Sequence, residues 1–436
     1  MAFHREAARC RGVVKEGVKV RTRIVVALVA LLAVVGLSAT AIAAPTHAKK
    51  LLAGPGVDTK RKTIHVSALL PLTGPQDGHQ ILYGLDAYFK YVNAHGGVGG
   101  YKIRYDAQDT QFNPTVAIQQ YQKDKDSTAM FAILLGTPSV TAVQAQLKGD
   151  GVLVAPISND GRWVRDPNMA PVQGTFQSAT AGLIEYVIKN RGGANQTFCE
   201  MKENDPLGAG FAGGAAFAVG YLHFKISKTV TFNITDPTMT GQVSDLKSAG
   251  CDVVIYEGAT GASILAATAA QQLNYNALWL MPQISYLAQY ATSPQASYLA
   301  SHWLLWDYGV AWSDTKAPGQ KLLVAMLKKY EHNPDPNIII QWGWQNGIAT
   351  VNVLKQALKN RDLSRAGLLK AASQLKTMTF GGMFPPLFYG GDSSKRRPSP
   401  AINIVKVDPK VPTGLATVRK FYSSSAAQGY IVQTFP

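Results

Sequence analysis

Short apolar runs and helical patterns alternate along the chain from residue 64 onward. The runs have the length of buried strands, and between them apolar residues recur at the three-to-four-residue spacing of one helix face. Strands are expected at 64–70, 102–108, 130–135 and 152–156, and helices near 81–95, 114–125 and 138–148. This alternation predicts a parallel sheet that is covered by helices on both sides.

A second series of the same kind begins after Phe176. Strands are expected at 197–201, 226–232, 252–257 and 277–282, and helices at 178–190, 208–222, 240–249 and 261–273. Helical patterns at 318–331 and 343–360 follow, and then a tail of strands and turns. The sequence therefore predicts an α/β protein with two lobes of similar size.

The first 43 residues have the pattern of a secretory signal. Basic residues precede an apolar run from Ile24 to Leu37, and the small residues Ala41-Ile42-Ala43 follow it. A run of about 14 residues is short for a membrane span, which needs roughly 20. We expect cleavage after Ala43 or Ala44 and a periplasmic or secreted protein. No Cys follows the run, so a lipid anchor is not expected.

Basic residues outnumber acidic ones by 43 to 27, but only 16% of residues are charged. That fraction is below the usual quarter, so the excess of base reflects scarce acids. The basic clusters, Lys49-Lys50 with Lys60-Arg61-Lys62 and Lys395-Arg396-Arg397, lie in Gly-, Pro- and Ser-rich segments and are expected to be solvated. Binding of nucleic acid needs a focused basic face with stacking aromatic side chains, so no nucleic-acid partner is predicted.

The chain lacks the usual enzyme motifs. It has no G-x-S-x-G elbow, no H-E-x-x-H, no P-loop and no two His residues at metal-binding spacing. Gly208-Ala209-Gly210-Phe211-Ala212-Gly213 matches a dinucleotide motif, but it begins too far after its strand. Close packing of a helix is the better interpretation of these glycines. We predict no enzyme activity, no catalytic residues, no metal and no cofactor.

Two cysteines remain after the expected signal is removed. Cys199 and Cys251 lie in strands that could be neighbours in one sheet. Cysteines of an exported chain can pair in a disulfide. Buried thiols that pack as small apolar side chains are an equal alternative.

The stretch 64–109 carries the most specific pattern. Its first strand ends in Pro71-Leu72-Thr73-Gly74-Pro75, its helix in Asn93-Ala94-His95-Gly96-Gly97-Val98-Gly99-Gly100, and its second strand at Asp109, followed by Pro114. These residues resemble the P-L-[ST]-G-P, N-x-x-G-G-[VI]-x-G and D-x-x-x-x-P motifs of the branched-chain amino acid-binding proteins, soluble receptors of bacterial ABC importers. The resemblance extends with decreasing clarity to about Val432.

The resemblance implies a type I periplasmic binding protein. Two Rossmann-like lobes with parallel sheets would be joined by three crossovers, with a ligand between them. The expected parts are a signal peptide, 1–43; a linker, 44–63; one lobe, 64–176 and 306–378; and a second lobe, 177–305 and 379–432. The implied partners are a small-molecule solute and an ABC permease with its ATPase subunits, and the protein would be a monomer. The solute would be amino acid-like, an amide, or a hydrophobic or aromatic carboxylate. A sensor module of the same fold, or a secreted hydrolase, is the alternative.

Loops at the carboxyl ends of strands are expected to hold the ligand, because open α/β sheets bind ligands at that edge. In the first loop, Thr137 suits a helix N-cap and Pro138 the first helical position. Free backbone N–H groups and the hydroxyls of Thr137 and Ser139 can hold a carboxylate there, a role that the resemblance also implies. The second loop, Ile157-Ser158-Asn159, aligns with the family segment that grips the ligand ammonium.

The third loop departs from the family pattern. Many amino acid-binding members place a Glu after the loop proline, as the countercharge for the ammonium, where this chain has Gln283. Leu207 and Ala259 stand where the family often has Tyr. These departures imply a larger, less cationic ligand. Trp163, Trp342 and Trp344 could stack on it, although packing in the core or hinge is the stronger alternative for each.

Overall fold

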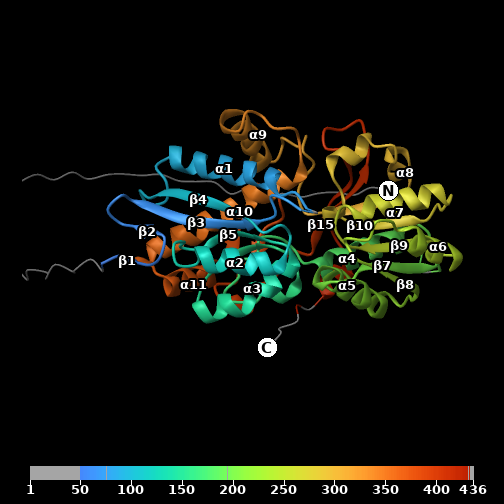
Figure 1. Ribbon diagram of the computed structural model, residues 1–436, viewed down its shortest axis with the longest axis horizontal. Coiled ribbons are helices and arrows are strands. Elements are labelled where there is room, and N and C mark those ends of the chain that lie inside the picture. The colour runs from blue at the N-terminus through green and yellow to red at the C-terminus, as the bar shows by residue number, and fades with distance from the viewer. Residues whose placement is uncertain (1–49, 75, 194, 431, 433–436) are drawn as a thin grey trace, which may run out of the picture. The chain divides into compact units, whose positions relative to one another are not determined.

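The computed structural model describes residues 50–430 except 75 and 194, together with residue 432 (Figure 1). The expected signal peptide, residues 1–43, lies outside these residues. The described residues belong to one compact unit, Lys49–Pro436. Within them, no helix combines the length and apolarity that a membrane span requires.

The first sheet contains the strands that the first apolar runs predicted. Its strands are β2 (Val57–Asp58), β3 (Thr63–Leu70), β4 (Lys102–Asp109), β5 (Phe131–Leu135) and β6 (Val154–Ile157). β3 pairs in parallel with β4 and β5, and β5 with β6. The segment expected as a linker contributes β2, antiparallel to β3, and β1 (Leu52–Ala53), which pairs with β12 (Asp362–Leu363).

Helices from two distant parts of the chain cover the first sheet. They are α1 (His79–Ala94), α2 (Pro114–Asp124), α3 (Thr137–Asp150), α9 (Pro318–Tyr330), α10 (Ile338–Lys359) and α11 (Arg365–Gln374). Leu69 of β3 packs with residues of α2 and α3, while its neighbours Ala68 and Leu70 pack with α1 and α10. Figure 1 shows α10 and α11, coloured orange, among the blue and cyan elements of this sheet.

Helix α10 begins five residues before the predicted start at 343. Asn337 caps it, because its side chain accepts a hydrogen bond from the backbone N–H of Ile339 (3.1 Å). The apolar residues that follow Asn337 are buried all round, so they lack the one-sided periodicity on which the prediction relied.

Two glycines let α1 and α10 touch through their backbones. A Cβ on Gly84 would lie 1.9 Å from the carbonyl oxygen of Ile340, and one on Gly343 would lie 1.8 Å from that of Ile81. Both distances are shorter than any real Cβ contact. The approach brings the first turns of α10, including Trp342, close to the loop that follows β3.

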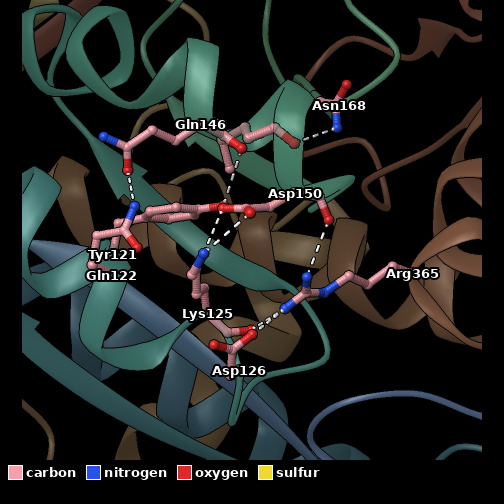
Figure 2. Close-up of polar contacts among 9 residues, drawn as sticks. Tyr121, Gln122, Lys125, Asp126, Gln146, Asp150, Asn168 and Arg365 are labelled. Carbon is pink, nitrogen blue, oxygen red and sulfur yellow. Dashed lines mark hydrogen bonds and ion pairs between the residues drawn. The ribbon is translucent and has the colours of Figure 1, made fainter.

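A polar network joins the ends of α2, α3 and α11 (Figure 2). Asp150 accepts a hydrogen bond from the Tyr121 hydroxyl (2.9 Å) and pairs with Lys125 (3.1 Å). Arg365 donates to the backbone oxygens of Asp150 (3.1 Å) and Lys125 (2.8 Å) and to the carboxylate of Asp126 (3.0 Å). One guanidinium therefore ties α11 to helices that precede it by more than two hundred residues, and fixes α3 at the end opposite its N-terminus.

The second sheet has seven strands in the order β16-β15-β11-β10-β9-β7-β8. They are β7 (Phe198–Glu203), β8 (Ile226–Phe232), β9 (Val253–Glu257), β10 (Leu278–Pro282), β11 (Trp303–Asp307), β15 (Ala401–Val407) and β16 (Leu415–Ser423). β7 to β10 are parallel, as predicted, and β11 continues the parallel series. β15 and β16 are antiparallel to their neighbours, so the sheet is mostly parallel rather than wholly so. The connection 408–414 is too short for a parallel crossover.

Helices pack around the second sheet. They are α4 (Phe176–Asn190), α5 (Pro206–Leu222), α6 (Thr240–Ser248), α7 (Ala262–Gln272), α8 (Ala296–His302) and α12 (Ser425–Gly429). Strand β11 and helix α8 were not predicted. A small hairpin, β13 (Thr377–Met378) with β14 (Leu387–Phe388), precedes β15.

Cys199 and Cys251 form a disulfide with a Cα–Cα distance of 5.9 Å. Cys199 lies in β7, and Cys251 lies just before β9, the strand that pairs with β7. The prediction of neighbouring strands is confirmed. Of the two alternatives, the structure has the disulfide.

The prediction that the cluster 395–397 is solvated is wrong for Arg396, whose residue is only 2% exposed. Its guanidinium stacks over the Tyr389 ring (4.8 Å), and Nη1 donates to the backbone oxygens of Asp166 (3.1 Å) and Met169. These partners offset part of the cost of taking the charge out of water. Composition alone gave no sign of them.

The substitution Gly343→Ala tests the contact between α1 and α10. It should lower the free energy of unfolding by roughly 3 kcal/mol, because the new methyl group has no space. Gly220→Ala in α5 is the matched control, since its Cβ would meet nothing within 4 Å. The control should stabilise by up to about 1 kcal/mol. Urea unfolding of both variants measures this, and equal effects would contradict the backbone contact.

Candidate functional site

A cavity of about 210 Å³ lies at the carboxyl ends of strands from both sheets. Seven of the eight predicted ligand residues line it: Thr137, Ile157, Ser158, Asn159, Leu207, Ala259 and Gln283. Ser139 does not. It is buried in α3, and its hydroxyl has no hydrogen-bond partner among the described residues. The structure thus brings together residues up to 146 positions apart (283 minus 137), while their roles stay predictions.

A chain of hydrogen bonds crosses the first two loops. The indole N–H of Trp163, in the short turn Gly161–Trp163, donates to the Ser158 hydroxyl oxygen (2.8 Å). The hydroxyls of Ser158 and Thr137 are bonded to each other at 2.8 Å. Only one of their two hydrogens can fill that bond. The other has no protein acceptor among the described residues, so the pair offers a buried donor to the cavity.

The start of α3 differs by one position from the prediction. Gly136 occupies the N-cap position with φ +98°, and Thr137 is the first helical residue. The Thr137 side chain is therefore engaged with Ser158 and caps nothing. The first backbone N–H groups of a helix lack intrahelical partners, so this end still favours an anion.

Gln283 presents a hydrogen-bond donor to the cavity. Its side-chain Oε1 accepts from the backbone N–H of Tyr308 (3.2 Å), which can only donate. The amide orientation is thereby fixed, with Nε2 as the remaining group. Nε2 is buried and has no partner among the described residues. A ligand oxygen would satisfy it, whereas an ammonium would not.

Backbone carbonyl oxygens of the second loop already accept hydrogen bonds within the protein. The Ile157 oxygen accepts from the Gly136 N–H (3.1 Å), and the Asn159 oxygen accepts from the Phe176 N–H (2.7 Å). The Asn159 side-chain Nδ2 donates to Gln173 (2.5 Å). Each carbonyl oxygen keeps a second lone pair, so the grip on an ammonium that the resemblance implied for this loop stays a prediction.

Acidic side chains end three strands of the second sheet but supply little negative charge. Burial, with Asp205 nearby, raises the pKa of Glu203 to about 8. Burial also raises the pKa of Asp307 to about 7 and that of Glu257 well above its usual value. Glu203 is thus mostly neutral at pH 7. Glu203 serves instead as an acceptor for the N–H of Ala259 (2.9 Å), a cavity residue.

The remaining lining is mostly apolar. Leu207 and Ala259 stand beside residues that the sequence analysis missed: Ile81, Phe112, Leu135, Phe176, Ile284, Tyr286, Leu287 and Ile339. Each lies at the end of a strand, in a loop after a strand or on a helix that reaches the cavity, and no local pattern marks it. Among the described residues, Asp77 is the only charged one in the lining; it is exposed and bonded to His79 (2.7 Å).

The three predicted tryptophans have different places. Trp342 lines the cavity. Trp163 donates a hydrogen bond to Ser158, and Trp344 packs edge-on against Tyr88 with ring centroids 4.8 Å apart. Only Trp342 is thus placed to contact a ligand directly.

One hydrogen bond spans the cavity between loops of the two sheets. The Thr260 hydroxyl, after β9, donates to the side-chain oxygen of Gln76, after β3 (3.1 Å). Both residues line the cavity, and neither was predicted.

Asp109 holds together two loops at the mouth of the cavity. Its carboxylate accepts from the N–H groups of Leu72 (2.8 Å) and Gln111 (2.8 Å) and from the hydroxyl of Thr73 (2.5 Å). Burial alone would raise the pKa of Asp109, but these hydrogen bonds outweigh it and lower the pKa to about 2. The carboxylate ties the turn after β3 to Gln111, whose neighbour Phe112 has φ +52° and lines the cavity. The described residues contain no group of three or more His, Cys, Asp or Glu that could hold a metal.

The sequence matches the family model for periplasmic binding proteins over residues 63–412. No curated protein sequence matches the chain. A fatty acid ABC transporter substrate-binding protein from Thermomonospora curvata has a similar structure, with a TM-score of 0.80 at 22% identity over 88% of this chain and 98% of that one.

Two further solved structures carry bound ligands. A branched chain amino acid ABC transporter from Thermus thermophilus with bound valine gives a TM-score of 0.72 at 15% identity, over 84% of this chain and 98% of that one. A solute binding protein of an ABC transporter from R. palustris in complex with 4-hydroxybenzoate gives 0.72 at 16%, over 85% and 100%.

The family match covers most of the chain, which therefore belongs to the periplasmic binding protein family. The predictions of the family, of the α/β fold and of a solute-binding protein for a small organic ligand are confirmed. Members of this family are extracytoplasmic and bind solutes without transforming them.

The substitution Asp109→Asn tests the tie at the cavity mouth. It should lower the free energy of unfolding by about 1 kcal/mol at pH 5, a value reduced because the group is partly exposed. The folded-state pKa is depressed, so this contribution is complete above about pH 4 and is lost as the pH falls through 2. The difference between wild type and variant should therefore shrink in acid.

Urea unfolding between pH 5 and about pH 2 measures this difference. Asp335→Asn is the matched control, because it removes the same charge at an exposed position and should change little. A pH-independent difference for Asp109→Asn would show that the carboxylate contributes only packing.

Proposed function

We propose that the protein is the binding component of an ABC importer for a small hydrophobic or aromatic carboxylic acid that lacks an α-ammonium group. The observation that carries this proposal is the direction of the buried hydrogen bonds. The Thr137–Ser158 pair and Gln283 both offer donors to the cavity. A carboxylate accepts such bonds, and an ammonium would leave them unpaired at a cost.

The volume and lining of the cavity support a small acid. About 210 Å³ corresponds to roughly seven waters at about 30 Å³ each. That space suits a short, branched or aromatic acid. The apolar lining, with Phe112, Phe176 and Trp342, suits its hydrocarbon part.

The ligand would be enclosed by two lobes that hinge together. Residues 64–176 with 306–378 would form one lobe, and 177–305 with 379–432 the other, joined by three crossovers. The bond between Thr260 and Gln76 would latch the closed form. Closure of this kind buries the ligand and excludes water.

Delivery would require an ABC permease and its ATPase subunits. We propose that the protein is exported to the periplasm or the medium by its N-terminal signal and acts as a monomer. It has no part in catalysis and needs no cofactor. Uptake of the identified acid by vesicles that contain the permease, with and without this protein, tests the import role.

The substitution Thr137→Val tests the carboxylate site. A hydrogen bond to a charged group contributes roughly 1.5–3 kcal/mol, so affinity for an acid such as benzoate or 4-methylpentanoate should fall about tenfold or more. Isothermal titration calorimetry measures this after a thermal-shift screen has chosen the acid.

Thr141→Val is the matched control for that experiment. It removes a hydroxyl one turn further along α3 that bonds to the Thr137 carbonyl (2.8 Å) and does not line the cavity. The affinity of this variant for the acid should remain within about twofold of the wild-type value, because substitutions away from a site usually change the free energy by about 0.5 kcal/mol or less. Equal losses in both variants would contradict a direct contact of Thr137 with the ligand.

The substitution Gln283→Glu tests the discrimination against amino acids. One carboxylate oxygen would still accept from Tyr308, and the other would face the cavity as a countercharge. The variant should then bind leucine about tenfold or more tightly than the wild-type protein does. It should bind simple acids more weakly than the wild-type protein does. Burial raises the pKa of an introduced carboxyl, so the gain should grow with pH.

Gln271→Glu, at an exposed position of α7, makes the same change of charge far from the cavity and should alter neither affinity. Leucine that binds wild type as tightly as the variant would contradict the role given to Gln283.

A further inference from the structure

A second cavity, of about 500 Å³, is lined by three arginines. Arg165 comes from the segment after the turn Gly161–Trp163, and Arg396 and Arg397 come from the segment before β15. Ser178 of α4 and Tyr430, after α12, complete another part of the wall. No Asp or Glu lines this cavity, and none of the three guanidiniums forms an ion pair among the described residues.

Arg396 is the buried member of this cluster. Its residue is 2% exposed, yet only Nη1 has hydrogen-bond partners, the backbone oxygens of Asp166 and Met169. Nε and Nη2 have no partner among the described residues. The contacts of Nη1 hold the segment before β15 in place. They leave the edge of the guanidinium that carries Nε and Nη2 without a partner among the described residues. A buried charge of this kind is costly unless it is paired.

Arg165 and Arg397 extend the same feature. The Nε of Arg165 is also buried without a partner among the described residues. Arg397 is exposed, and its backbone N–H is bonded to the Phe388 oxygen (2.8 Å), which fixes the position of its Cα at the rim. Two unpaired guanidinium edges and one accessible guanidinium thus surround a single space.

The geometry points to a second binding site, for a small anion that carries a carboxylate or phosphate group. Guanidinium presents parallel N–H donors that match two oxygens of such a group. The oxyanion would pair with the free edge of Arg396 and with Arg165, and Arg397 would close over it. Phe388 and the prolines of the segment 386–400 would contact an organic part of the ligand.

This site is separate from the cavity proposed for the imported solute. The two cavities have no lining residue in common. The first would hold a carboxylate by hydroxyl and amide donors, and its described lining has no cationic side chain, whereas the charged side chains that line the second are all cationic. Its walls come from the segment that leads from the first sheet into α4 and from the segment that precedes β15. An anion bound there would contact both segments.

Calorimetric titration of the exported protein with inorganic phosphate and with citrate, at constant ionic strength set by sodium chloride, tests this proposal. Saturable binding of at least one of the two anions is expected. Arg165→Gln and Arg397→Gln should each weaken it about tenfold or more. These positions are chosen because Arg396 also holds backbone. Binding of phosphate but not citrate would show that the site prefers a phosphate group, and binding of citrate but not phosphate would show that it prefers a carboxylate.

Two controls make the result decisive. Lys395→Gln removes an adjacent positive charge that does not line the cavity, and Thr137→Val alters the first cavity; neither should change the affinity for the anion. Absence of saturable binding of both anions would overturn the proposal. So would an equal loss with Lys395→Gln, which indicates diffuse attraction, or a loss with Thr137→Val, which places the anion in the first cavity.

Discussion

The hydrogen bond from the Trp163 indole to the Ser158 hydroxyl sets the polarity of the ligand cavity. An indole N–H can only donate, so Ser158 must accept, and the Ser158–Thr137 pair is left with one donor for the cavity. Gln283 is fixed in the same sense by the Tyr308 N–H. Both constraints come from groups that cannot reverse their role. They act in a buried place, where an unpaired polar group is most costly.

The rest of the structure keeps these donors in position and limits the buried negative charge near them. Gly84 and Gly343 bring α10 against α1, and Arg365 fixes the far end of α3, whose first residue is Thr137. Burial raises the pKa of Glu203 to about 8, so this carboxyl at the end of β7 does not act as a full countercharge near pH 7. The cavity is therefore rich in donors, almost without charge, and mostly apolar.

Much of this was predictable from the sequence, and the limits have physical causes. Apolar runs and glycine stops predicted the parallel strands, and the positions after those strands predicted seven cavity residues. The antiparallel pairing of β15 with β16 was not predicted, because the sequence showed strands and turns in this tail without fixing their direction. The orientation of the Gln283 amide depends on Tyr308, 25 residues further along the chain. The burial of Arg396 depends on carbonyls 227 and 230 residues away. Local patterns carry no information on such contacts.

The central claim is that the cavity selects a carboxylate without an α-ammonium group. Leucine and 4-methylpentanoate differ only in that group, so their relative affinity for the wild-type protein isolates it. Calorimetric titration of both at pH 7 is the most direct test. The account predicts that 4-methylpentanoate binds about tenfold or more tightly than leucine, since an ammonium would face donors and lack a countercharge. Tighter binding of leucine would contradict it and would restore the amino acid specificity that is common in the branched-chain amino acid-binding proteins.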